Sequence, residues 1–165
     1  MFVRFVLLTL LGSFSLFGES IIVADKVIVK KSTRMLYLSR QGEIYKKYHV
    51  SLGQVPVGAK EIEGDMKTPE GVYRLDWRQE SGQYYKSLHV SYPNTTERSH
   101  AKELGTNAGG MIMIHGTPPS WSLSPYGDWM NVLIDWTEGC VAMSNDDMEE
   151  VWEHTKNGTI IVIVP

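Results

Sequence analysis

The sequence has few of the groups that stabilise small proteins through disulfides or metal ions. Its 165 residues include one cysteine, so no disulfide can form within the chain. The spacings typical of metal sites (Cys-x-x-Cys, His-x-x-x-His, Asp-x-Asp) do not occur, and one cysteine with five scattered histidines is poor zinc chemistry. We therefore predict no metal and no cofactor. The single thiol, Cys140, is either a buried, inert group or a reactive one.

An excess of basic residues is also missing. Lysine and arginine number 16 against 19 aspartates and glutamates, which gives a formal net charge of −3. A nucleic-acid-binding domain normally carries a basic patch or stripe, so this balance argues against nucleic acid as a partner. With 42% hydrophobic residues, a chain of this length is expected to form one domain and to bury a core without disulfides.

Long apolar runs are absent except at the start of the chain. After Arg4, residues 5–17 form an apolar run of thirteen residues, shorter than the about 20 residues that a membrane-spanning helix needs. Gly18-Glu19-Ser20 then offers a small-x-small cleavage site. We predict a secretory signal peptide at residues 1–20 and a single domain at residues 21–165, with an uncleaved membrane anchor as the alternative. The domain is therefore expected to be exported.

Short apolar segments separated by turn residues make up most of the remaining chain. Helices are expected at 95–104, 127–133 and 145–156, and the last is the best defined because Ser144 and Asp147 form a helix-start signal. Gly, Pro and charged residues predict a loop at 53–69. Many strands and few helices favour a mainly β fold, a sandwich or a barrel-like sheet. The predicted strands are 21–30, 35–38, 44–52, 71–77, 88–92, 111–114 and 159–164.

The functional interpretation depends on the surroundings of Cys140. Gly139 precedes this cysteine, and a helix start follows it a few residues later. Upstream, the apolar run 111–114 ends in His115-Gly116, whereas the other four histidines lie in predicted strands, in a loop or on the last helix. A thiol and an imidazole, each after an apolar segment and each beside a glycine, indicate a nucleophile–base pair. A thiol close to a helix N-terminus would also have a lowered pKa.

These residues resemble the catalytic core of the L,D-transpeptidases (YkuD-type domains), which carry His-Gly and, downstream, Ser/Thr-x-Gly-Cys. The likeness covers nearly all of the chain after residue 20, in the family's order, through Tyr48–Gly53, Gly64–Gly71 and Ser91–Asn94. The resemblance implies a β-sandwich of mixed sheets with one or two helices beside the catalytic loop. It also implies an enzyme of the periplasm or cell envelope that acts on peptidoglycan without a cofactor.

The resemblance assigns chemical roles to a few groups. Cys140 would attack the carbonyl of the third, diamino-acid residue of a tetrapeptide stem, and the terminal D-alanine would leave. His115 would take the thiol proton and return one to the leaving amine, while the backbone N–H groups of Gly139 and Cys140 would stabilise the oxyanion. An amine of a neighbouring stem, or of an envelope-protein lysine, would then resolve the thioester. Water in that role would make the protein an L,D-carboxypeptidase, and a non-catalytic envelope-binding module is the alternative from another class.

Two features depart from the family pattern. The usual Ser-His-Gly-Cys reads Thr137-Glu138-Gly139-Cys140 here, and Ala142 stands where Arg or Asn often follows. Glu138 could raise the thiol pKa, orient His115 as the third member of a triad, or face solvent. The gap from His115 to Cys140 is also long and rich in proline and tryptophan.

Other residues are candidates for contact with substrate. Thr137, Gly116, Tyr92 and Trp136 could orient the catalytic groups or bind substrate, and residues 92–102 could form a flap over the site. The tryptophans of the insert could line a groove for a peptide or a glycan, although core packing is at least as common a role for such residues: these are Trp121, Trp129 and Trp136. The remaining candidates in predicted loops are Asp65, Lys67, Thr68, Asn94, Arg98 and Lys102.

Overall fold

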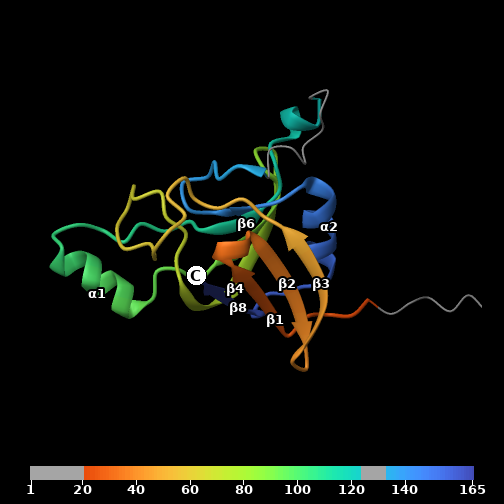
Figure 1. Cartoon of the computed structure of the whole chain (residues 1–165), viewed down its shortest axis with the longest axis horizontal. Helices are drawn as coiled ribbons and strands as arrows, with labels where there is room; N and C mark the ends of the chain where they lie inside the picture. The colour runs from red at the N-terminus through yellow and green to blue at the C-terminus, as the bar shows by residue number, and fades with distance from the viewer. Residues whose placement is uncertain (1–20, 124–132) are drawn as a thin grey trace, which may run out of the picture.

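The computed structural model describes residues 21–123 and 133–165 (Figure 1). Within these ranges it contains eight strands, two α-helices and two short 3-10 helices. The strands are β1 (Lys26–Lys30), β2 (Met35–Arg40), β3 (Glu43–His49), β4 (Gly71–Ser81), β5 (Tyr85–Val90), β6 (Met113–His115), β7 (Val141–Ala142) and β8 (Ile160–Val164). The helices are α1 (Thr95–Glu103), α2 (Asn145–Glu153), η1 (Lys31–Thr33) and η2 (Pro119–Leu123).

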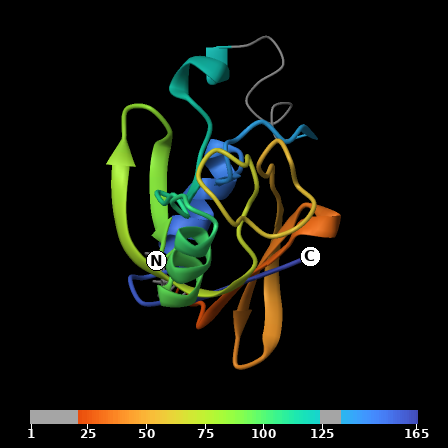
Figure 2. The same cartoon turned by 90° about the vertical axis from the view of Figure 1, so that its left-hand side faces the viewer.

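The described strands pair into one mixed sheet, in the order β3-β2-β1-β8-β4-β5-β6-β7. The β1–β8 and β6–β7 pairs are parallel, and the others are antiparallel. The predicted mainly β fold with one or two helices is therefore confirmed. Figure 2 shows α2 lying between the β4–β5 hairpin and the β1–β3 strands.

Strand β4 joins the two halves of the sheet. Residues 71–74 pair with β8, while Leu75 and residues 78–81 pair with β5, and the register shifts between Leu75 and Arg78. Such an irregularity bends a strand and increases its twist. One continuous strand therefore turns the β5–β6–β7 half away from the β3–β2–β1–β8 half.

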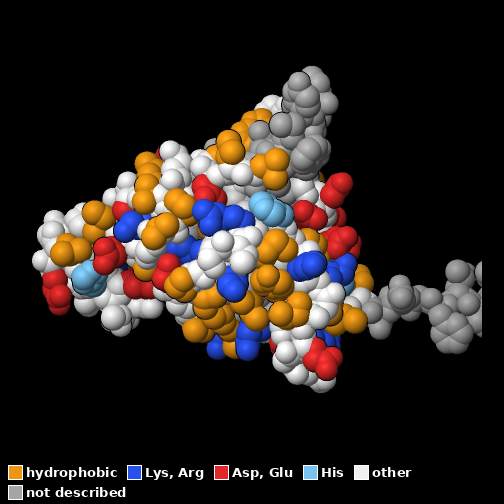
Figure 3. All heavy atoms as spheres, in the orientation of Figure 1, with side chains coloured by type: hydrophobic (Ala, Val, Ile, Leu, Met, Phe, Trp, Pro, Cys, Tyr) orange, Lys and Arg blue, Asp and Glu red, His pale blue; other side chains and the backbone are white. Residues whose placement is uncertain are grey.

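The alternation of buried and exposed side chains along the strands shows which face of the sheet covers the core. In β1 and β8, the side chains of Val27, Val29, Ile161 and Ile163 point to one side and are at most 1% exposed. Helix α2 adds Met148 and Val151 to the same core. The opposite face of β1 and β2 is not covered by either described helix, and Figure 3 shows hydrophobic side chains gathered there.

Several strands and helices begin or end at other residues than predicted. The hairpin across Gln41-Gly42 is confirmed, but β3 ends at His49 because the next residues turn to form isolated bridges, Ser51 with Ala142 and Gly53 with Thr137. Strand β4 is four residues longer than predicted, and β6 begins two residues later than predicted and includes His115. The helix predicted at 145–156 ends at Glu153, with Ser144 accepting from the Asp147 N–H as its cap. The helix predicted at 127–133 falls, except for its last residue, outside the described residues.

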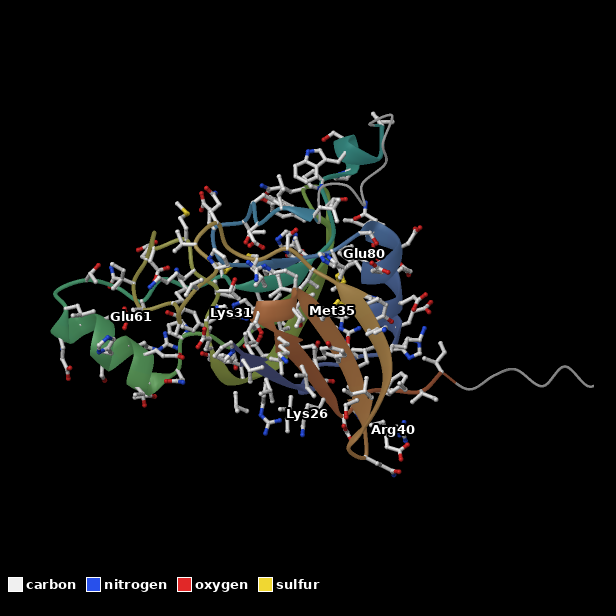
Figure 4. The ribbon with its side chains drawn as sticks, in the orientation of Figure 1. Lys26, Lys31, Met35, Arg40, Glu61 and Glu80 are labelled. Atoms are coloured by element: carbon white, nitrogen blue, oxygen red, sulfur yellow. The ribbon has the colours of Figure 1, made fainter. Side chains whose placement is uncertain are left out.

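The loop between β3 and β4 has no strand of its own and is fixed by two buried lysines. The ammonium of Lys31, 2% exposed, donates to the carbonyls of Gly58 and Thr68 and pairs with Glu70 at 2.8 Å. Lys60, 6% exposed, pairs with Asp65 at 2.8 Å. Figure 4 shows Lys31 beside this loop and Glu61 toward α1. Both ammonium groups satisfy their hydrogen bonds locally, as buried charges must.

Candidate active site

Thr137 sets the conformation of the turn that carries the thiol. Its hydroxyl donates to the carbonyl of Cys140 at 2.8 Å and accepts from the Gly139 N–H at 3.1 Å. Gly139 has φ +135°, and a Cβ there would lie 2.6 Å from the carbonyl oxygen of Lys67. The turn therefore needs a hydroxyl at position 137 and a glycine at 139.

The thiol of Cys140 is partly buried and contacts the backbone of the β6 segment. Its Sγ accepts from the Met113 N–H at 3.4 Å and lies 3.6 Å from the Met111 carbonyl oxygen. Burial raises the thiol pKa above its ordinary value, the Met113 N–H opposes this, and the charge of Glu138 adds to the increase. The lowered thiol pKa that a nearby helix N-terminus would give is not observed, since removal from water has the largest effect and raises the pKa. At neutral pH the group is a thiol rather than a thiolate.

His115, at the end of β6, is 2% exposed. Its Nδ1 lies 2.6 Å from the carbonyl oxygen of Gly116. Because a carbonyl only accepts, Nδ1 carries the hydrogen and Nε2 keeps its lone pair. Burial lowers the pKa of His115 to about 4, although the bond to Gly116 acts in the opposite direction. The imidazole is therefore neutral at pH 7, with Nε2 available as a base.

Gly116 lets the neighbouring chain approach closely. A Cβ at this position would lie 2.3 Å from Oδ1 of Asn145, which accepts from the Thr117 N–H at 2.9 Å. A side chain would force this amide away and displace the start of α2. Gly116 thus positions His115 in two ways, through its carbonyl and through its lack of a side chain.

The sheet brings the two predicted catalytic residues together. Strands β6 and β7 pair in parallel, with Ile114 opposite Val141 and His115 opposite Ala142. Cys140, immediately before β7, and His115, at the end of β6, line one cavity of about 450 Å³. The rest of its lining is mostly uncharged and includes Gln54, Gln79, Gln83, Tyr84, Ser87 and Trp136.

Aromatic rings cover His115. The Tyr84 ring lies 4.4 Å from the imidazole between centroids, and the Trp136 ring meets it edge-on at 5.7 Å. Trp121 packs against Trp136 at 4.7 Å. Trp136 therefore lines the cavity as predicted for a groove residue, while Trp121 supports it. Trp129 lies outside the described residues.

One of the two backbone N–H groups predicted to stabilise the oxyanion has a hydrogen-bond partner within the turn. The Gly139 N–H is already donated to the Thr137 hydroxyl, inside the turn. Only the Cys140 N–H is left of the predicted pair. The sequence could not show this, because the hydroxyl that competes for the amide belongs to the same turn.

Glu138 is exposed and lines the thiol cavity. Among the described residues it has no ion pair with His115, whose Nδ1 is held by Gly116 instead. The group that orients the imidazole, the third member of a catalytic triad, is therefore the backbone carbonyl of Gly116. What Glu138 does is raise the thiol pKa through its charge.

Other predicted residues have structural roles or line a different cavity. Tyr92 is 3% exposed and donates its hydroxyl to the Ala108 carbonyl, so it is a core residue and not part of a flap. Asn94 caps α1, and the Thr68 hydroxyl accepts from the buried Gly53 N–H. Asp65 holds Lys60. Helix α1 extends away from the sheet (Figure 1), and its Arg98 and Lys102 line a different cavity.

Three functional candidates had no clear sequence signal. Tyr84 reaches His115 from the tip of the β4–β5 hairpin, and Lys60 lines a second cavity beside Cys140. Asp135 pairs with Arg34 at 2.7 Å and accepts from the Leu52 N–H, which fixes the segment that leads into the thiol turn. Each contact joins segments far apart in the sequence, so no local pattern could have predicted it.

The described residues hold no group of three or more His, Cys, Asp or Glu side chains arranged to bind a metal ion. Within the same ranges, both α-helices have nine residues and none could cross a membrane.

Comparisons with known proteins show what the sequence and the fold are similar to. Among curated proteins, the “Putative L,D-transpeptidase YafK” of Escherichia coli (strain K12) is 28% identical over 133 residues, which are 78% of this chain and 45% of the relative. The structure of the helical cell shape determining protein Pgp2 from Campylobacter jejuni has a TM-score of 0.60 at 26% identity, over 84% of this chain and 46% of that one. The structure of Bd1075 from Bdellovibrio bacteriovorus has a TM-score of 0.56 at 25% identity, over 88% of this chain and 48% of that one.

This chain therefore spans less than half the length of these relatives. The model of the L,D-transpeptidase catalytic domain (YkuD) matches residues 24–163, nearly the whole described chain. The chain belongs to the L,D-transpeptidase catalytic-domain family.

Proposed function

We propose that the protein is an exported peptidoglycan L,D-transpeptidase that uses Cys140 as its nucleophile. The observation that carries this proposal is the common cavity of Cys140 and His115, with the imidazole held in the tautomer that leaves Nε2 unprotonated. Residues 21–165 form the catalytic domain, and residues 1–20 act as the signal peptide. The description of Pgp2 as a cell shape determining protein supports a role in shaping the wall.

The first half-reaction begins from a neutral pair. Nε2 of His115 takes the Sγ proton as sulfur attacks the carbonyl carbon of the third stem residue. The Cys140 N–H donates to the oxygen that becomes negative, a contact typically worth about 3 kcal/mol in the transition state. The tetrahedral intermediate collapses, the carbon–nitrogen bond breaks, and the D-alanine amine leaves with the proton from His115. A thioester on Cys140 remains.

The second half-reaction repeats these steps with an incoming nucleophile. The amine of a neighbouring stem, or of an envelope-protein lysine, attacks the thioester carbon and the carbon–sulfur bond breaks. The proton removed from the amine returns to sulfur through His115. Attack by water in the same place would trim the stem, so cross-linking and L,D-carboxypeptidase activity share the acyl-enzyme.

The acyl-enzyme is the species to test. Intact-mass measurement after incubation with a carbapenem should show one adduct on the wild type and none on Cys140→Ala. Incubation of tetrapeptide-rich sacculi with the wild type should then yield cross-linked stems. If water is the acceptor, it should yield tripeptide stems instead. An adduct on the alanine variant, or unchanged stems with a correctly folded wild type, would refute the proposal.

A further inference from the structure

Two more cavities continue from Cys140 toward α1. The first, of about 200 Å³, shares Met111, Glu138 and Cys140 with the His115 cavity. The second, of about 640 Å³, shares Glu63 and Gly109 with the first and extends along α1. The thiol can therefore be reached from the aromatic side and from the α1 side.

Backbone contacts hold the junction between these two cavities. The Glu63 N–H donates to the Asn107 carbonyl at 2.8 Å. Gly109 has φ +77°, and a Cβ there would lie 3.3 Å from Cα of Glu63. The two loops thus pack directly against each other, and the opening is part of the folded structure.

The charge of the α1 side changes sign along its length. Next to the thiol the exposed carboxylates are those of Glu138 and Glu63, because the ammonium of Lys60 is already paired with Asp65. Beyond Glu63 the lining carries Arg98 and Lys102. Four residues apart on α1, these two lie on one helix face, and neither has an ion-pair partner among the described residues. The thiol end is acidic and the α1 end is basic.

We propose that the α1 cavity is a carboxylate subsite for an amine-bearing peptide stem. Arg98 and Lys102 bind its carboxylates, while Glu63 and Glu138 attract its ammonium group to Cys140. This inference rests on the proposed function and names its acceptor. A diamino-acid stem has both charges, with the ammonium several bonds from the terminal carboxylate. A lysine side chain has the ammonium alone, and water has neither.

Transfer of the acyl group to the amine needs only solvent and His115 as proton acceptors. The ammonium loses one proton to solvent on leaving the acidic end, and the free amine nitrogen forms a bond to the thioester carbon. The carbon–sulfur bond breaks, the second proton passes from nitrogen to Nε2 of His115, and it is then returned to sulfur. Arg98 and Lys102 take no part in these bonds. They act by positioning the acceptor, so their removal should be seen in KM rather than in kcat.

The first experiment compares acceptors on the acyl-enzyme. Arg98→Gln/Lys102→Gln should lower kcat/KM for transfer to a tetrapeptide stem about tenfold or more, through KM, since two charge-assisted contacts are lost. Transfer to Nα-acetyl-lysine amide and hydrolysis by water should stay within about twofold, because those acceptors have no carboxylate to lose. The matched control, Lys156→Gln, removes an exposed cation beyond α2 and should change none of the three. Equal loss with lysine amide, or no loss with the stem, would overturn the subsite.

A binding measurement separates this inference from the proposed function. On Cys140→Ala, calorimetric titration with a tripeptide stem, which lacks the terminal D-alanine of the donor, should give a Kd that the double variant weakens about tenfold, and the carboxamide analogue of the peptide should bind as weakly to both. If no acyl-enzyme ever forms but this dependence holds, the proposed function fails and the subsite stands. If both proteins bind the peptide equally, the subsite is wrong whatever the turnover.

Discussion

The Nδ1–H of His115 is donated to the carbonyl of the next residue, Gly116, at 2.6 Å. The orienting group of this site is therefore supplied by the backbone, and no carboxylate is needed to hold the imidazole. This arrangement is uncharged, so the bond to Gly116 offsets only part of the cost of protonating a buried imidazole. The low pKa of His115 follows from that burial.

His115 should make stability depend on pH. Its folded pKa of about 4 lies below the ordinary 6.5, so the unfolded chain binds its proton first as the pH falls. The contribution of His115 to the free energy of unfolding is fully present above pH 6.5 and is lost between pH 6.5 and about 4. It amounts to about 3 kcal/mol. Urea unfolding of wild type and His115→Gln at pH 7 and pH 4 checks this. The wild type should lose more stability by that amount, and equal losses would contradict the assignment.

Tyr84 should keep the pKa of His115 low. Its ring lies against the imidazole and excludes water from it. Tyr84→Ala should raise the His115 pKa toward 6.5, measured from the ring-proton shifts in an NMR titration. As the pH is lowered, the acylation rate of this variant should therefore begin to fall at a higher pH than that of the wild type. Tyr84→Phe keeps the ring and serves as the control. A low pKa in the alanine variant would mean that the sheet alone dehydrates His115.

Gly139 should tolerate no side chain. Gly139→Ala places a Cβ 2.6 Å from the Lys67 carbonyl oxygen at a φ that other residues rarely adopt. We expect a loss of more than about 2 kcal/mol in unfolding free energy, together with slower acylation. Gly42 also has a positive φ, +87°, but open space around it, so Gly42→Ala should cost about 1 kcal/mol and leave acylation unchanged. Similar costs at both positions would show that the turn can yield.

Removing the charge of Glu138 should lower the pKa of the Cys140 thiol, because that charge opposes formation of the thiolate. The rate of alkylation by iodoacetamide should therefore reach its midpoint at a lower pH in Glu138→Gln than in the wild type. Glu61→Gln removes an exposed carboxylate beside α1 and should have no effect. An unchanged midpoint with lost turnover would support an orienting role for Glu138 instead.

Local features of the fold could be predicted from the sequence. Alternation located most strands, and the capping pair at Ser144 located the start of α2, because both signals depend on neighbouring residues. The nucleophile–base pair could be inferred from glycine neighbours and from the family resemblance. The proximity of Cys140 and His115 itself comes from the parallel β6–β7 pairing, which no local pattern specifies.

Properties of the site that depend on packing could not be predicted. A thiol close to the α2 N-terminus would have a lowered pKa, but the pKa of Cys140 is raised, mainly by burial. Tyr92 was a candidate for contact with substrate because it begins the segment 92–102, which was predicted as a flap over the site. Its ring is instead buried, and its hydroxyl bonds to Ala108. The competition of the Thr137 hydroxyl for the Gly139 amide likewise appears only when the turn is folded.

Strand β4 belongs to both halves of the sheet, so the half that carries Cys140 and His115 cannot be moved to another protein as an independent module. Cutting the chain within β4 would leave β8 without one of its two neighbours and would expose a hydrophobic edge. Insertions are better tolerated elsewhere, such as the Gln41-Gly42 turn, which lies outside the β4–β8 pairing and where Gly42 has open space around it. A designer who wishes to change what this domain binds should therefore keep the whole sheet and exchange only the loops around its cavities.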